Sequence, residues 1–348
     1  MSAEPILFES FFAKTAYRSA AAPEKGVVAP PRPILLLSAL PRSGANYLEA
    51  LLLQHPSCRA SRVPEDFFLA NSAGLISFCD AVTESWDEWW RQRLGGTSRL
   101  AESVGAALLN FADAASPREW GDESRLLMRS PTIDGIEAAK LLFPSAQILI
   151  LVRNGPETVE SGHRSFGWWY DDAIRAWRKS VRRLLSFVDS TEPGRCRLVR
   201  FEDLVADPAQ EIARILEFLE LDNQWYPYYQ VDSLPVLGSS SHGRENGEPV
   251  HWRPVAKTAE FDPLTRAKDW PARRQKRFAW LAGAERARLG YPAPPLSAAD
   301  RVLNVAMDVF HAVRRAIVRV AMSWQCHPNL FSDRQWRYLR WRNLRTIT

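Results

Sequence analysis

Residues 34–52 have the sequence ILLLSALPRSGANYLEALL, an apolar run that breaks at Pro-Arg-Ser-Gly and resumes with helical spacing. This pattern predicts a buried strand, a tight turn and a helix. The first backbone N–H groups of a helix have no intrahelical partner, and the positive end of the helix dipole lies behind them. Gly44 permits the close backbone approach that an oxyanion requires. We therefore expect an anion site at this turn.

Further short apolar runs predict buried strands at residues 125–130, 146–153 and 196–202, with a weaker candidate at 58–63. Helical patterns lie between them, at residues 44–54, 134–142, 156–165, 171–190 and 208–220. Strands that alternate with helices predict an α/β fold with three α/β/α layers and a central parallel sheet. Ligands of such sheets bind beyond the carboxyl ends of the strands, where the Pro-Arg-Ser-Gly turn falls.

The chain divides by composition into three parts. Residues 1–33 are a flexible lead-in, residues 34–300 form the α/β domain with a helical insertion at about 64–124, and residues 301–348 form a basic helical extension. In the extension, apolar residues recur at helical spacing: Val302, Val305, Ala306, Val309, Val313 and Ile317. We expect this stripe to pack on the domain. Dimerisation and contact with an anionic membrane surface are the alternatives.

Charge and cysteine usage narrow the class of protein. The net charge of +5 comes mostly from arginine, whose planar fork suits phosphate and sulfate, but this excess does not indicate nucleic-acid binding. The four cysteines form no Cys-x-x-Cys pair, and the His and Glu residues share no metal-binding spacing, so we expect no metal. The first 33 residues lack an apolar leader, and charges interrupt residues 302–324. These features predict a cytoplasmic protein, at most membrane-peripheral.

A second anion site is predicted in LVRNGPETVES, residues 151–161. Arg153 ends a strand there, and Ser161 follows eight residues later in a helix opened by Pro156, so both can reach one dianionic group. The segment LVRFEDLVADPAQEIARILEFLEL, residues 198–221, then predicts a strand, an acidic turn and an amphipathic helix. The Gly-x4-Gly-Lys-Ser/Thr loop of nucleoside-triphosphate enzymes is missing from the sequence.

These three motifs, in this order, resemble those of the sulfotransferases that use 3′-phosphoadenosine 5′-phosphosulfate (PAPS), over roughly residues 34–292. HWRPVAKTAEFDPLTRAKDW, residues 251–270, is similar to the C-terminal region of bacterial members. The resemblance implies a fold like that of P-loop nucleoside-triphosphate hydrolases. It also implies sulfuryl transfer to a hydroxyl of a carbohydrate, lipid-linked or natural-product acceptor, with release of adenosine 3′,5′-bisphosphate (PAP). Ala45 and Asn46 stand where the family usually has two Thr or Ser, although the Asn46 amide can still donate.

The resemblance also implies roles for individual residues. The nucleotide would be bound by Arg42, Ser43, Gly44, Ala45, Asn46, Tyr47, Arg153, Ser161 and Arg244, the last in the polar loop at 239–247. Arg42 would neutralise charge that develops on the leaving phosphate. Glu65 is the expected general base for the acceptor hydroxyl, with Asp66 and His55 as the competing candidates. Arg129 would contact the sulfate or the acceptor, unless it forms a structural ion pair.

Two other functions remain open at this point. A nucleotide-dependent kinase of related fold is disfavoured, because the loop has no lysine followed by Ser or Thr and no clear magnesium-binding carboxylate is found. A non-catalytic protein that keeps the anion loop as a scaffold is the other alternative.

Overall fold

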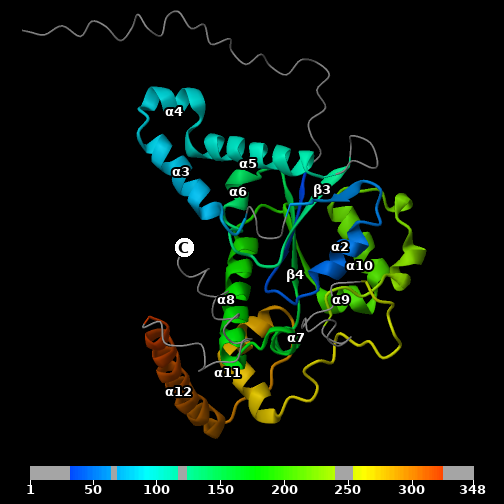
Figure 1. Ribbon diagram of the computed structural model, residues 1–348, viewed down its shortest axis with the longest axis vertical. Helices are drawn as coiled ribbons and strands as arrows, with labels where there is room; N and C mark the ends of the chain where they lie inside the picture. Colours follow the sequence, from blue (N-terminus) through cyan, green and yellow to red (C-terminus); the bar gives the residue numbers. More distant parts are fainter. Residues whose placement is uncertain (1–31, 64–68, 117–123, 240–253, 324–348) are drawn as a thin grey trace, which may run out of the picture. The chain divides into compact units, whose positions relative to one another are not determined.

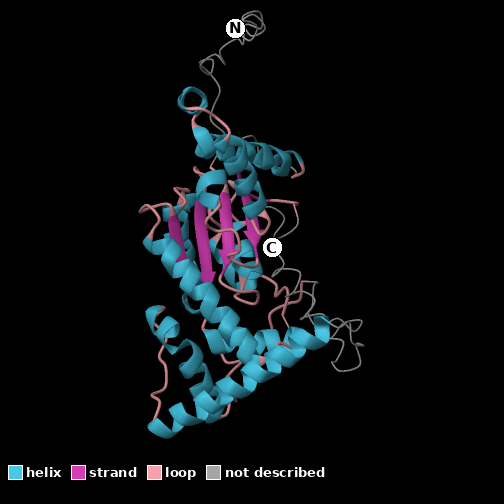
Figure 2. Ribbon diagram, turned by 90° about the vertical axis from the view of Figure 1, so that its left-hand side faces the viewer, coloured by secondary structure: helices cyan, strands magenta, loops and turns pink. Residues whose placement is uncertain are grey.

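A computed structural model describes residues 32–63, 69–116, 124–239 and 254–323, without the side chains of residues 318–323. These described residues form one compact unit. Its five strands are β1 (Ile34–Ser38), β2 (Cys58–Ala60), β3 (Arg125–Ser130), β4 (Gln147–Val152) and β5 (Cys196–Arg200). They form a single parallel sheet in the order β2-β3-β1-β4-β5, visible edge-on in Figure 1 and as magenta arrows in Figure 2. The predicted central parallel sheet is confirmed.

The helices, in chain order, are α2 (Ala45–Leu52), α3 (Ser72–Glu84), α4 (Glu88–Leu94), α5 (Gly96–Ala114), α6 (Ala139–Leu142), α7 (Gly155–Phe166), α8 (Tyr170–Asp189), α9 (Phe201–Ala206), α10 (Pro208–Phe218), α11 (Ala272–Arg288) and α12 (Ala298–Ser323), with 3₁₀ turns at Asn223–Trp225 and Tyr228–Ser233. Three of them, α3 to α5, lie within the region expected to be a helical insertion. The domain boundaries themselves stay a prediction.

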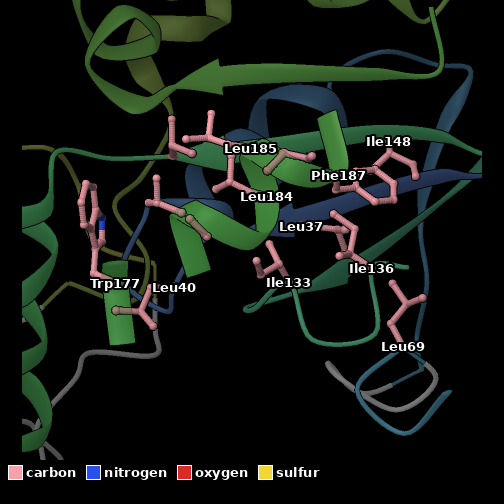
Figure 3. Close-up of a cluster of buried hydrophobic side chains, with 14 of the residues drawn as sticks. Leu37, Leu40, Leu69, Ile133, Ile136, Ile148, Trp177, Leu184, Leu185 and Phe187 are labelled. Atoms are coloured by element: carbon pink, nitrogen blue, oxygen red, sulfur yellow. The ribbon is translucent and has the colours of Figure 1, made fainter. Parts of the chain in front are cut away.

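Both faces of the sheet are buried, because alternate strand residues point to opposite sides. Ile34 and Leu36 belong to an apolar cluster with residues of α2, α9 and α10. Leu37 and Ile148 belong to a second cluster with Trp177 and other residues of α8, part of which Figure 3 shows. The sheet therefore lies between two helical layers, as Figure 1 shows, and the predicted three-layer fold is confirmed.

Some expected elements are shorter in the structure. The helix predicted over residues 134–142 begins only at Ala139, because Gly135 has a φ of +78° and a Cβ there would lie 1.7 Å from the Leu69 carbonyl oxygen. The strand predicted over 196–202 ends at Arg200, since Phe201 already begins α9. The weak strand at 58–63 covers only three residues.

The helix α12 packs beside α11, as Figure 1 shows, but with the opposite face from the one we expected. Its polar residues Asp308 and Arg314 pair with arginine and aspartate residues of the domain, while Val302, Val309 and Val313 remain exposed. The prediction that the apolar stripe packs on the domain is therefore wrong. Within the described residues, no helix is long and apolar enough to cross a membrane.

Candidate active site

The turn between β1 and α2 is shaped by two residues with left-handed backbone. Arg42 has a φ of 77° and Gly44 a φ of 102°. A Cβ at Gly44 would lie 2.3 Å from the ring of Phe201, so only glycine fits between this turn and the start of α9. The hydroxyl of the buried Ser43 donates to the Leu40 carbonyl at 2.7 Å. The Ser43 hydroxyl therefore holds the turn, and its backbone N–H remains as a donor for a ligand, so binding of the nucleotide by Ser43 stays a prediction.

The start of α2 presents free backbone donors. The N–H groups of Tyr47 and Leu48 bond to the Gly44 carbonyl, at 3.0 and 3.3 Å. Within the described part of the chain, no hydrogen bond takes up the N–H groups of Gly44, Ala45 and Asn46. These three groups lie at the positive end of the helix dipole, so they form a cradle for an oxyanion. Tyr47 was also included among the expected nucleotide-binding residues; its N–H already bonds to the Gly44 carbonyl, and its role stays a prediction.

The two predicted anion sites are in direct contact. The Arg42 Nε donates to the Ser161 Oγ at 3.2 Å, across 119 residues of sequence. The buried Arg153 donates from Nη1 to the Arg42 carbonyl at 3.0 Å and from Nη2 to the Pro263 carbonyl, while its Nε has no hydrogen-bond partner among the described residues. Arg153 therefore holds the turn in place and keeps one buried donor. The structure gives one continuous site in place of two separate pockets.

Three arginine side chains, Arg42, Arg153 and Arg266, lie close enough in this site to affect one another's pKa. Burial, followed by the neighbouring charges of Arg266 and Arg153, lowers the pKa of the Arg42 guanidinium to about 9. Burial and the charge of Arg266 lower the pKa of Arg153 to about 10, although the nearby carboxylates of Glu157 and Glu202 act in the opposite direction. Among the described residues, neither Arg42 nor Arg153 takes part in an ion pair with Asp or Glu. An anion with several charges would relieve this repulsion, so the cluster suits a nucleotide with two phosphate groups.

Binding of PAP should therefore stabilise the protein. With PAP at about a hundred times its dissociation constant, the free energy of unfolding should rise by about 2.7 kcal/mol and the unfolding midpoint by a few degrees. Thermal unfolding followed by circular dichroism, with adenosine as the matched ligand without phosphates, measures the effect. An equal shift with adenosine would show that the arginine cluster contributes nothing.

Arg266 is a functional candidate that the sequence reasoning missed. It is buried, and its side chain contributes to the lowered pKa of both Arg42 and Arg153. The segment that carries it is fixed to α7, since the Ala267 N–H donates to Glu157 at 3.1 Å and the Trp270 indole N–H donates to Glu160 at 2.7 Å. Arg266 lies in residues 251–270, which resemble the C-terminal region of bacterial sulfotransferases. That resemblance could have pointed to Arg266, but it assigned no role to any arginine of the segment.

Arg129 lies beside α2 at the same rim of the sheet. Its Nη1 donates to the Asn46 Oδ1, which leaves the Asn46 amide NH₂ as a donor for a ligand. Its Nε is 3.2 Å from the Glu49 Oε2, in a partly buried ion pair. The structural ion pair that we had kept as the alternative is thus present, and a catalytic role for Arg129 stays a prediction.

The remaining candidates fall into two groups. Glu65, Asp66 and Arg244 lie outside the described residues, so their roles stay predictions. His55 is buried at the end of α2, where its Nδ1 accepts from the Ser57 N–H and its Nε2 lies 3.1 Å from the Asp222 carbonyl oxygen. Both ring nitrogens of His55 have structural partners, so it is a poor candidate for the general base.

Comparison with known proteins identifies the family. Residues 33–226, more than half of the chain, match the sequence profile of the Sulfotransferase family. The chain belongs to the sulfotransferase family. It is 24% identical over 201 residues to protein-tyrosine sulfotransferase A of Caenorhabditis elegans. The aligned residues cover 54% of this chain and 50% of the relative. It is also 24% identical to protein-tyrosine sulfotransferase 2 of Gallus gallus, covering 54% and 51%. The chain thus spans about half the length of these curated relatives.

Solved sulfotransferase structures are also similar to this chain. The sulfotransferase domain of the Synechococcus olefin synthase has a TM-score of 0.45 and 19% identity, covering 78% of this chain and 99% of that one. A mouse sulfotransferase complexed with PAP has a TM-score of 0.41 and 12% identity, covering 75% and 89%.

The comparisons correct one expectation and leave another without support. The prediction of a cytoplasmic protein is contradicted by the curated relatives, which are protein-tyrosine sulfotransferases. Cysteine spacing and an N-terminal stretch without an apolar leader were too weak a basis for that prediction. Solved structures of bacterial sulfotransferases are among the similar ones, as the resemblance suggested, but the curated relatives come from animals, so a bacterial source has no support.

Replacing Ser161 with alanine should weaken the binding of PAP about tenfold or more, because it removes one hydrogen bond to a charged group. The affinity for adenosine 5′-phosphate, which lacks the 3′-phosphate, should change much less. Isothermal titration calorimetry measures both. Ser165→Ala is the matched control, since Ser165 is a buried serine one turn further along α7 whose hydroxyl has no hydrogen-bond partner in the part of the chain that the structure describes. Equal losses for both nucleotides would contradict a role at the 3′-phosphate.

Proposed function

We propose that this chain transfers the sulfuryl group of PAPS to an acceptor hydroxyl and releases PAP. The observation that carries the proposal is the contact between Arg42 and Ser161, backed by Arg153, at the free N-terminus of α2. Two arginines that form no ion pair with Asp or Glu among the described residues, beside free backbone N–H donors, are suited to a ligand with phosphates at two positions.

The residues of the site fit such a nucleotide. The N–H groups of Gly44, Ala45 and Asn46, together with Arg42, would hold the 5′-phosphosulfate. The Ser161 hydroxyl and the unpartnered Nε of Arg153 would hold the 3′-phosphate. Arg266 adds a third positive charge beside both arginines. Arg244 is proposed as a further 3′-phosphate ligand on sequence alone.

The chemistry follows from where charge develops. PAPS supplies an activated sulfuryl group, and its transfer leaves negative charge on the 5′-phosphate. Arg42 is held by its contact with Ser161 and by Arg153 at its backbone carbonyl, so it can stabilise that charge without reorganising. Glu65 would take the proton of the acceptor hydroxyl. Sulfuryl transfer then depends on positioning and electrostatic stabilisation, as phosphoryl transfer does.

The relatives of this chain bear on the class of acceptor. The curated relatives are protein-tyrosine sulfotransferases, which adds the tyrosine phenol to the carbohydrate, lipid-linked and natural-product hydroxyls considered above. A phenol has a pKa of about 10, well below that of an aliphatic alcohol, so a carboxylate base assists it more easily. We therefore put the tyrosine hydroxyl of a peptide or protein first.

Incubation with sulfur-labelled PAPS tests the function and the acceptor together. The acceptors are a tyrosine-containing peptide, the same peptide with phenylalanine in place of tyrosine, a simple phenol and a monosaccharide. We expect label on the tyrosine peptide and none on its phenylalanine counterpart. Label on the monosaccharide alone would overturn the tyrosine assignment. A further incubation uses an extract of the native host as the source of acceptors. If no hydroxyl compound of that extract becomes labelled, the sulfotransferase proposal is overturned.

A further inference from the structure

One side of α12 exposes a row of large apolar side chains, which we call the apolar face. Its members are 43–72% exposed, and they are Val302, Leu303, Val305, Val309, Phe310, Val313 and Ile317. At 100° per residue these positions fall on one half of the helix. A contiguous apolar surface of this kind on a folded domain marks a contact site.

The opposite side of α12 is fixed to the domain by polar contacts. The buried Arg277 of α11 donates to Asp308 at 2.7 Å and pairs with the buried Asp171 of α8. Arg314 of α12 donates to Asp172 at 2.7 Å. Turning α12 to bury its apolar face would separate these pairs, and leaving a buried charge without its partner is strongly destabilising. The apolar face is therefore held outward.

Positive charge gathers on the same part of the chain. Residues 298–348 contain nine arginines, three aspartates and no lysine or glutamate, so their excess of six positive charges is larger than the +5 of the whole protein. Arg301 of α12 is exposed. Arg273, also exposed, lies beside α12, with its Nη2 3.7 Å from the Met307 sulfur. A positively charged segment with an exposed apolar face has the two properties that bind anionic lipid.

We propose that the apolar face of α12 lies on an anionic lipid surface, with the helix parallel to the bilayer and the domain held above it. Charge complementarity favours anionic lipid over a second copy of this chain as the partner of the apolar face. A second copy would bring two strongly positive extensions together, and the like charges would repel, whereas anionic lipid headgroups neutralise them. This proposal is independent of the sulfotransferase chemistry, because it uses none of the residues of the candidate active site.

Co-sedimentation of the full-length protein with vesicles tests the proposal. The vesicles are phosphatidylcholine mixed with phosphatidylserine, and phosphatidylcholine alone. The test variant is Val309→Gln with Val313→Gln. The matched control is Phe78→Gln with Trp225→Gln, which removes two apolar side chains of similar exposure, 58% and 69%, from elsewhere on the surface. Measurements of thermal unfolding and of PAP binding test whether both variants fold.

We expect the wild type and the control to bind the phosphatidylserine vesicles. Binding should weaken with added salt, and the test variant should bind about tenfold more weakly or worse. Failure of the wild type to bind, or an equal loss in the control, would overturn the proposal. A lipid-free dimer in analytical ultracentrifugation that dissociates when Val309 and Val313 are replaced would overturn it in favour of a second copy.

Discussion

Replacing Arg42 with alanine should lower turnover by about 10²–10³, the range for loss of one preorganised group that stabilises transition-state charge. The same change should leave the unfolding midpoint of the ligand-free protein equal or higher. Arg42 is crowded by Arg153 and Arg266, and its lowered pKa reports a charge that folding disfavours. Initial rates with sulfur-labelled PAPS and thermal unfolding measure the two effects.

Two variants give this test its controls. Arg288→Ala removes an exposed arginine whose ion pair with Asp189 is also exposed, so both activity and stability should stay near wild type. Arg42→Lys keeps the charge but loses the donor to Ser161, so it should recover part of the lost turnover. If Arg42→Ala unfolds at a clearly lower temperature, the residue is structural and its assigned catalytic role is wrong.

Replacing Glu65 with glutamine should lower turnover by about 10²–10⁴, because the amide cannot accept the proton of the acceptor hydroxyl. PAP does not need that proton transfer to bind, so its affinity should stay within a few-fold of wild type. Single-turnover rates and calorimetric titration with PAP separate the two quantities.

Asp66→Asn is the matched control for Glu65→Gln, because it neutralises the neighbouring carboxylate. Its turnover should remain close to wild type. If Asp66→Asn abolishes turnover and Glu65→Gln does not, Asp66 is the base. Loss of PAP binding with intact chemistry in the Glu65 variant would instead give that residue a structural role.

The sheet and the turn at its carboxyl edge were readable from sequence for a simple physical reason. Parallel strands buried on both faces appear as continuous apolar runs, as in residues 34–38 and 147–152. The break at Pro-Arg-Ser-Gly then located the turn at the carboxyl end of the central strand. Local signals of this kind depend on neighbouring residues, and they placed Arg42, Arg153 and Ser161 near the carboxyl ends of the strands, where the structure brings them together.

Contacts between segments that are far apart in the sequence could not be predicted from these local patterns. The bond between Arg42 and Ser161 joins residues 119 apart, and the hydrogen bond from the Ser43 hydroxyl to Leu40 depends on the exact shape of the turn. The spacing of α12 showed an apolar stripe but could not tell which side of the helix docks. The side that docks is determined by Asp171 and Arg277, an ion pair of the preceding domain that holds the polar side of α12.

A calorimetric titration of the wild-type protein with PAP and with ATP, each with and without magnesium, tests the nucleotide site most directly. The contact between Arg42 and Ser161 predicts that PAP binds at least about tenfold more tightly than ATP and that magnesium is not needed. Tighter binding of ATP, or binding only in the presence of magnesium, would contradict a site built for a 3′,5′-bisphosphate.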